Sequence, residues 1–301
     1  MSKVAARVDP VLLAQILAWA AEFDDFAVHH AADGLYVAEA CVDRPDQREQ
    51  VLAIALVSAF WFWFDDRSDK FLREQRSPVD WDTLTAFERD EPPPGLAASP
   101  GGLGHTPEVR YFQRLCELLA PLAAHPGEHR WWRIGSVMVF RAMAAEEAMS
   151  RGGAARSLAE CMETGAHSTT LPSILTAAHL VRGMNRPSRH GDPRVGDIER
   201  YLYLSQRLLN DLNSSEKERR EGHAGRVSNS VLLLENDMPP ERARAFIEAQ
   251  RRGYERLLLH NLERLGPDDA FAAMISRLVQ RINGWYEAGP LRFEPDASEA
   301  T

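Results

Sequence analysis

Apolar residues recur along most of this chain at the spacing of an α-helix. Residues 11–23 place Leu12, Ile16 and Trp19 on one helical face. Residues 50–64 are apolar nearly all round, which predicts a buried central helix. The same periodicity predicts further helices over residues 109–119, 131–149, 158–184, 196–212, 240–265 and 268–286. The two-residue alternation of a β-strand is almost absent, so we expect an all-α fold.

Stretches rich in proline and glycine indicate where the helices are interrupted. Residues 91–107 predict one long loop, and the residues around 185–192 predict a second. The segment before residue 91 is too short to bury a core of its own. We therefore expect a single domain over residues 1–301, with its helical core at about 10–288 and a flexible tail at 290–301.

Composition and charge exclude several classes of protein. The net charge of -9 argues against binding to nucleic acid through a basic face. An anionic ligand is still compatible with this charge, because bound cations can reverse the local sign of a site. The three cysteines, Cys41, Cys116 and Cys161, suggest neither a disulfide framework nor a cysteine metal site, so we expect a reduced, cytoplasmic location. Residues 51–64 are too short to span a membrane, and the first residues lack the pattern of a signal peptide.

The first group of candidate site residues is acidic and follows the most apolar stretch. Asp65, Asp66 and Asp69 come directly after the aromatic residues 60–64. Asp65 and Asp69 are four residues apart, so they project from the same face of a helix. Two stacked carboxylates repel each other unless a cation lies between them, and oxygen ligands of this kind suit Mg²⁺. The alternative is a solvated helix end, but the aromatic neighbourhood argues against it.

The second group lies on a later predicted helix. Asn210, Ser214 and Glu218 are spaced by four residues, so their oxygen atoms form one stripe over two turns. Arg207 and Lys217 add cationic donors that suit a phosphate group. The alternative is an exposed polar helix. Two such half-sites on different helices make chemical sense together when metal ions and a polyanion fill the space between them.

These two motifs resemble those of the class I terpene synthase family. Residues 65–69 match the aspartate-rich DDxxD motif, and residues 210–218 match the second metal motif, NDxxSxxxE, including the lysine before the final glutamate. The order, the separation, the chain length and the helical pattern agree with that family. The residues around both motifs are most similar to bacterial labdane-related diterpene synthases of the ent-kaurene synthase type.

The resemblance implies a helical bundle of the isoprenoid synthase type with a central, aromatic-lined cavity. It implies three Mg²⁺ ions that hold a diphosphate group. The metal ligands and catalytic residues would be Asp65, Asp69, Asn210, Ser214 and Glu218. Arg207 and Lys217 would contact the diphosphate.

Several residues are candidates for the wall of that cavity. The aromatic candidates are Trp61, Phe64, Phe140, Trp285 and Tyr286, each of which is also compatible with ordinary core packing. Gly165 and Pro172 predict a break in the helix over residues 158–184. Near this break, the hydroxyls of Ser168, Thr169 and Thr170 either point at the substrate or bond back to their own helix.

Two features depart from the family pattern. Family members often carry an arginine that senses the diphosphate four residues before a glycine at the helix break. If Gly165 is that glycine, Cys161 stands at the sensor position. Many members also end with an Arg-Tyr pair, whereas Trp285 and Tyr286 stand here, with Arg292 beyond them.

The resemblance therefore predicts a Mg²⁺-dependent diterpene synthase. The enzyme would ionise copalyl or geranylgeranyl diphosphate, cyclise the carbocation and release diphosphate. The alternatives are a sesquiterpene synthase acting on farnesyl diphosphate, a chain-elongating prenyltransferase, which the asparagine-serine-glutamate motif disfavours, and a non-catalytic helical protein that binds an isoprenoid diphosphate. The chain has no DxDD pattern, so a separate class II cyclase would have to supply copalyl diphosphate. A homodimer is expected from the resemblance alone.

Overall fold

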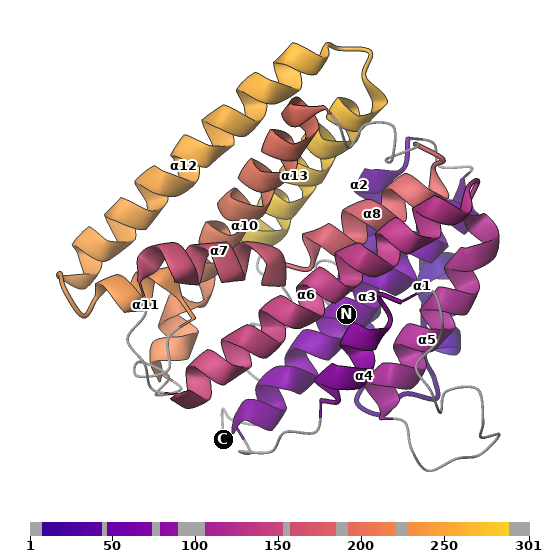
Figure 1. Ribbon diagram of the computed structural model, residues 1–301, viewed down its shortest axis with the longest axis horizontal. Helices are drawn as coiled ribbons and strands as arrows, with labels where there is room; N and C mark the ends of the chain where they lie inside the picture. The colour runs from indigo at the N-terminus through magenta and orange to yellow at the C-terminus, as the bar shows by residue number, and fades with distance from the viewer. Residues whose placement is uncertain are drawn as a thin grey trace.

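Every regular element of the described structure is a helix, which confirms the all-α prediction. The structure is a computed structural model that describes residues 8–43, 47–73, 79–89, 106–152, 157–184, 192–220 and 228–288. The helices are α1 (Pro10–Trp19), α2 (Val28–Cys41), α3 (Arg48–Arg73), α4 (Trp81–Ala86), α5 (Pro107–Leu119), the 3₁₀ helix η2 (Ala120–Leu122), α6 (Pro126–Gly152), α7 (Leu158–Ser168), α8 (Leu171–Val181), α10 (Pro193–Arg220), α11 (Ser230–Leu234), α12 (Pro240–Leu265) and α13 (Ala270–Ala288) (Figure 1).

Three of the predicted irregular segments lie mostly or wholly outside the described residues. These are the loop at 91–107 except for its last two residues, the loop at 185–192 except for Asp192, and the tail at 290–301. None of the described helices combines the length and the apolar character that crossing a membrane requires.

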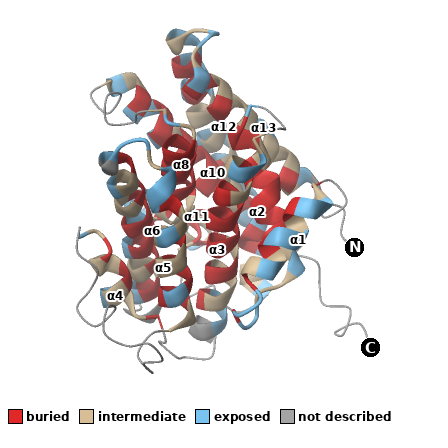
Figure 2. Ribbon diagram, turned by 90° about the vertical axis from the view of Figure 1, so that its right-hand side faces the viewer, coloured by how far each residue is buried: buried red, intermediate tan, exposed pale blue. Residues whose placement is uncertain are grey.

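Two groups of helices meet at the centre of the molecule. Helix α3 packs along α2 and against α8, and α8 in turn packs on α6. On the other side, α10 packs against α7 and α12, while α13 joins this group to α2. Figure 1 shows α12 as a long helix at one outer edge, and Figure 2 shows the buried residues gathered on α2, α3, α8 and α10.

Helix α3 carries the centre of an aromatic core, because its apolar run is buried on most sides. Phe60, Trp61, Trp63 and Phe64 are almost completely buried. The Phe60 ring lies at contact distance from the rings of Tyr111, Phe112 and Phe140, which come from α5 and α6. Tilted and edge-on aromatic pairs of this kind stabilise a core beyond their buried area.

Helix α2 is absent from the helices that the sequence pattern predicts. Its buried side includes His30 and Asp33 as well as apolar residues, so the periodicity of apolar positions is weak. Gly34 allows the close approach of α2 to α3, because a Cβ atom there would lie 2.6 Å from the backbone nitrogen of Ala59. The helix is therefore specified by its packing against α3 and by polar partners on other helices.

The predicted break between residues 158 and 184 is present, but it does not occur at Gly165. Helix α7 ends at Ser168 and α8 begins at Leu171. Thr170, between the two helices, has a φ of 67°, in the left-handed region that a threonine rarely adopts. Pro172 lies in the first turn of α8, where its missing N–H costs no helical hydrogen bond. Gly165 lies inside α7.

Candidate active site

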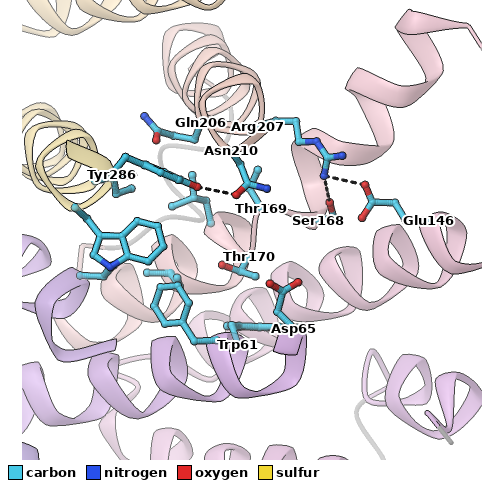
Figure 3. Close-up of a pocket in the computed structure, with 16 residues that line it drawn as sticks. Trp61, Asp65, Glu146, Ser168, Thr169, Thr170, Gln206, Arg207, Asn210 and Tyr286 are labelled. Atoms are coloured by element: carbon cyan, nitrogen blue, oxygen red, sulfur yellow. Dashed lines mark hydrogen bonds and ion pairs between the residues drawn. The ribbon is translucent and has the colours of Figure 1, made fainter. Parts of the chain in front are cut away.

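A cavity of about 120 Å³ lies where α3, α8, α10 and α13 meet. A single water molecule needs only about 10–15 Å³ by a comparable measure, so this space suits an organic ligand. Asp65 of α3 and Asn210 of α10 both line the cavity, as do Trp61 and Tyr286 (Figure 3). Trp285 also lines it. The two predicted motifs therefore meet at one cavity, through the first residue of each.

The three aspartates of the first motif face different surroundings. Asp65 lines the cavity. The Oδ2 atom of Asp66 lies 3.2 Å from His29 Nε2 and 3.1 Å from His30 Nε2, both on α2. Asp69 is exposed and is not part of the cavity wall. Within this motif, only Asp65 reaches the cavity, because successive helical positions point in different directions.

A possible transition-metal site is formed by His29, His30 and Asp66. The position of the ring hydrogen on His30 argues against metal binding there. The backbone N–H of Ala27 donates to His30 Nδ1 at 2.9 Å. A neutral His30 must therefore carry its proton on Nε2, where it donates to Asp66 and has no lone pair for a metal ion. We conclude that the two histidines orient Asp66 and join α2 to α3.

Arg207 is held among carboxylates beside the cavity. Its NH1 lies 2.9 Å from Glu146 Oε1, and its Nε lies 2.9 Å from Asp211 Oδ1. It also donates to Ser168 Oγ at 3.2 Å and to the carbonyl oxygen of Ser228. Burial opposes the charge of Arg207, but the carboxylates of Asp211 and Glu146 raise its pKa, so the guanidinium remains charged.

The position of Arg207 explains why a glycine stands at position 165. A Cβ atom on Gly165 would lie 2.5 Å from Arg207 Nε, so the guanidinium group occupies the space that a side chain on α7 would need. Cys161, one turn earlier, donates its thiol hydrogen to the carbonyl oxygen of Ser228 at 2.7 Å. Burial raises the pKa of Cys161 to about 11, so this thiol is neutral. The positive charge on this side of the cavity therefore comes from α10.

The residues of the second motif are connected by hydrogen bonds. Asn210 Oδ1 accepts a hydrogen bond of 2.9 Å from the hydroxyl of Tyr286. Ser214 Oγ and Glu218 Oε1 lie 3.1 and 3.2 Å from the same atom, the Nδ2 of Asn229. The oxygen atoms of Ser214 and Glu218 therefore converge, as a shared metal ion requires. Lys217 is half-buried and does not line the cavity.

Two of the hydroxyl groups near the helix break are bonded to the carbonyl oxygens of α7. Ser168 Oγ donates to the carbonyl oxygen of Gly165 at 3.1 Å, and Thr169 Oγ1 donates to that of Ala166 at 2.8 Å. Both residues line the cavity, as expected. Of the two interpretations given for the hydroxyls at this break, the structure supports the back-bonded one for Ser168 and Thr169. Thr170 also lines the cavity.

Three predicted wall residues lie elsewhere. Phe64 and Phe140 contact each other, with ring centroids 5.5 Å apart, inside the aromatic core. Gly165 is covered by Arg207. Phe62, which was not predicted, lines the cavity and lies next to Trp285. The rotation of each helix about its axis decides these placements, and a continuous apolar run does not reveal it.

Other residues of the site carry weak signals in the sequence. Glu146 lines the cavity from the C-terminal part of α6, and burial raises the pKa of its carboxyl group in spite of Arg207. Gln206 also lines the cavity, and its Oε1 is buried without a hydrogen-bond partner among the described residues. The Nε1 of Trp285 donates to the buried Asp33 at 2.9 Å, which fixes that ring in the wall. None of these residues belongs to a spaced motif.

The charges around the cavity fit divalent metal ions. Asp65 and Glu146 line it, and Asp211 forms an ion pair with Arg207. Arg207 is the only arginine or lysine among the described residues that line the cavity. A diphosphate group would be repelled by such a surplus of carboxylates unless cations accompanied it. Carboxylate, amide and hydroxyl oxygens are the ligands that Mg²⁺ prefers.

Known structures share this architecture over nearly the whole chain. The linalool/nerolidol synthase from Streptomyces clavuligerus in complex with 2-fluorogeranyl diphosphate is similar with a TM-score of 0.70 and 18% identity, over 96% of each chain. The wild-type cucumene synthase is similar with a TM-score of 0.66 and 17% identity, over 95% of this chain and 96% of that one. The 2-methylisoborneol synthase from Streptomyces coelicolor A3(2) is similar with a TM-score of 0.70 and 15% identity, over 96% of this chain and 93% of that one. The fold is that of the class I terpene synthases.

Residues 57–256 match the family model described as "Terpene synthase family 2, C-terminal metal binding". The match covers more than half of the 301 residues, and the chain belongs to this family of bacterial-type class I terpene synthases. This result confirms the predicted class of enzyme. The narrower likeness to diterpene synthases of the ent-kaurene type stays a prediction.

Proposed function

We propose that this terpene synthase ionises an isoprenoid diphosphate of twenty carbons, copalyl or geranylgeranyl diphosphate, and cyclises the resulting cation. The observation that carries the proposal is the meeting of Asp65, Asn210 and Arg207 at one cavity with aromatic walls. The structural relative that is complexed with 2-fluorogeranyl diphosphate supports a prenyl diphosphate as the ligand. The length of the prenyl chain follows from the sequence likeness alone.

Asp65, with Asp69 in support, would hold Mg²⁺ on the α3 side. Asn210, Ser214 and Glu218 would hold it on the α10 side. The proposal keeps three ions, as the resemblance implies. When bound, the metal ions neutralise the charge that develops on the departing diphosphate.

Arg207 gives this site a fixed positive charge next to the diphosphate. Because Glu146, Asp211 and Ser168 already hold its guanidinium group, it needs little reorganisation when the leaving group becomes more negative. Its place over Gly165 lets it supply the charge that Cys161 cannot supply from α7. Lys217 would approach the diphosphate from the last turns of α10.

The walls of the cavity would protect the carbocation. Trp61, Phe62 and Trp285 present aromatic faces that attract positive charge but are poor nucleophiles. The hydroxyls of Ser168 and Thr169 donate to backbone carbonyls, so they do not offer a free proton to the substrate. The aromatic part of the wall would limit contact between the cation and water, which would otherwise quench it.

The substrate is tested by incubating the purified protein and Mg²⁺ with geranyl, farnesyl, geranylgeranyl and copalyl diphosphates, followed by gas chromatography of the extracts. We expect a cyclic diterpene from a twenty-carbon substrate. Product from farnesyl diphosphate alone would favour the sesquiterpene alternative, and longer linear diphosphates would indicate chain elongation. No turnover of any substrate would favour a protein that only binds isoprenoid diphosphates.

The metal ligands are tested by Asp65→Ala and Asn210→Ala. Each variant should lower turnover by roughly 100-fold or more, the usual effect of removing a group that stabilises transition-state charge. Helical circular dichroism should stay unchanged. Glu241→Ala, an exposed acid on α12, is the control. Full activity in both site variants would refute the assignment. A homodimer and a separate class II cyclase that supplies copalyl diphosphate remain part of the proposal.

A further inference from the structure

Three hydrogen bonds converge on a buried side chain that belongs to neither motif. The Nδ2 of Asn229 lies 3.0 Å from the carbonyl oxygen of Asp211, 3.1 Å from Ser214 Oγ and 3.2 Å from Glu218 Oε1. Asn229 is 1% exposed. An amide nitrogen carries two hydrogens, so the three acceptors share them, and all three lie on α10. Two of the three acceptors are proposed metal ligands.

The other end of the same amide fixes its orientation. Asn229 Oδ1 accepts hydrogen bonds from the backbone nitrogens of Val231 at 2.9 Å and Leu232 at 3.3 Å, as the N-cap of α11. Because these two N–H groups need an acceptor, the carbonyl end of the amide must face α11. The Nδ2 end then faces α10 by necessity.

The backbone on both sides of Asn229 is anchored to the same helix. The carbonyl oxygen of Ser228 accepts a hydrogen bond from the guanidinium group of Arg207. The backbone nitrogen of Ser230 donates to Asp211 Oδ2 at 3.0 Å. The distance between Asn229 and α10 is therefore set by neighbours on each side, independently of its own side chain.

We infer that Asn229 is a positioning residue for the metal-binding oxygens of Ser214 and Glu218. The inference rests on the proposed function and adds a residue to it. A glutamate side chain loses rotamer freedom when it binds an ion, which opposes binding. Asn229 holds Glu218 and Ser214 together before an ion arrives, so less freedom is lost at that moment. Loss of such a partner of metal ligands typically weakens metal binding by about 10–100-fold.

The variant Asn229→Ser separates this role from the capping of α11. Serine caps a helix about as well as asparagine but has no amide nitrogen to reach Ser214 and Glu218. The measurement is the unfolding temperature during a Mg²⁺ titration at constant inorganic pyrophosphate. The Mg²⁺ concentration at the midpoint of the shift should rise about 10-fold or more. Asp80→Ser, the same kind of exchange at the N-cap of α4, should leave the midpoint unchanged.

A second pair of variants tests the contact without any metal. In Asn229→Asp an anionic oxygen faces Glu218, and the two carboxylates repel each other, so the unfolding temperature of the ion-free protein should fall. Adding Glu218→Gln places an amide donor opposite the new carboxylate and should restore part of the loss. Strictly additive effects would contradict the inference.

The outcomes distinguish the two proposals. If the wild-type protein shows a Mg²⁺-dependent shift that Asn229→Ser shares at the same midpoint, only the role of Asn229 is wrong. If the wild-type protein shows no such shift, the metal sites of the proposed function fail, and the inference about Asn229 fails with them.

Discussion

The hydroxyl of Tyr286 donates a hydrogen bond of 2.9 Å to Asn210 Oδ1, which joins α13, the last of the described helices, to the first residue of the second motif. Both residues line the cavity, and Figure 3 shows the hydrogen bond between them as a dashed line. A hydroxyl donor selects the carbonyl end of the amide. Tyr286 therefore determines which end of Asn210 is available to a ligand, since the second lone pair of Oδ1 is left for it.

Tyr286→Phe should raise the Mg²⁺ requirement. The variant keeps the ring but lets the Asn210 amide turn its NH₂ group toward the metal. A hydrogen bond contributes a net stabilisation of about 0.5–1.5 kcal/mol, so the midpoint of a Mg²⁺ titration with pyrophosphate should rise by up to about 10-fold. Tyr201→Phe, on α10 but stacked on Tyr254 instead of facing the cavity, is the control. A midpoint below that of the wild type would mean that the hydroxyl competes with the ion.

Gly165→Ala should disturb Arg207. The added Cβ would lie 2.5 Å from Arg207 Nε, and the guanidinium is held by two carboxylates that do not let it move freely. Overpacking of this kind costs about 1–3 kcal/mol of folding free energy. Turnover should fall as well, because the arginine is displaced.

Gly196→Ala provides the matched comparison for that variant. Gly196 also lies inside a helix, but a Cβ there meets nothing within 4 Å. Alanine is favoured over glycine in a helix by roughly 0.5–1 kcal/mol, so this variant should unfold at a higher temperature. Denaturant unfolding of both variants checks the pair. Equal stability of Gly165→Ala and Gly196→Ala would contradict the packing argument.

Glu146 should make stability depend on pH. Burial raises the pKa of its carboxyl group above the ordinary value of 4.5, although Arg207 opposes the shift. The folded protein therefore binds this proton more tightly than the unfolded chain does. The resulting stabilisation is complete below pH 4.5 and is lost as the pH rises through the folded-state pKa.

The variant Glu146→Gln has no such proton, so the pair isolates this contribution. The unfolding temperature of the wild type, relative to that of Glu146→Gln, should fall as the pH rises above 4.5. Thermal unfolding of both proteins across a pH series measures the difference. A difference that grows in favour of the wild type with rising pH would give the opposite sign and disprove the assignment.

Helices with an apolar core side could be predicted from the sequence, whereas α2 could not. The predicted helix over residues 240–265 coincides with α12. In α2 the buried side includes His30 and Asp33, and their partners are Asp66 on α3 and Trp285 on α13. Buried polar groups are stable only with such partners. The partners are distant in sequence, so local periodicity does not reveal them.

The candidate site also contains residues that the sequence could identify and residues that it could not. Asp65 and Asn210 begin compact motifs whose spacing matches the helical repeat, so they were identifiable without a structure. Asn229 follows Asn210 by nineteen residues and reaches α10 from the start of another helix, which no spacing rule predicts. The displacement of Phe64 and Phe140 from the cavity wall depends on how α3 and α6 are rotated, which is set by tertiary packing.

The aromatic core around α3 has a consequence for how the products of such enzymes can change. Its interlocked rings belong to Phe60, Trp61, Phe64, Phe112 and Phe140. A substitution in that core would disrupt several ring contacts at once. Of these rings only that of Trp61 lines the cavity, whereas Ile174 on α8 and Ile282 on α13 line it with aliphatic chains. Exchanges among aliphatic residues usually cost less than about 1.5 kcal/mol, so new product skeletons would be reached most readily from that side.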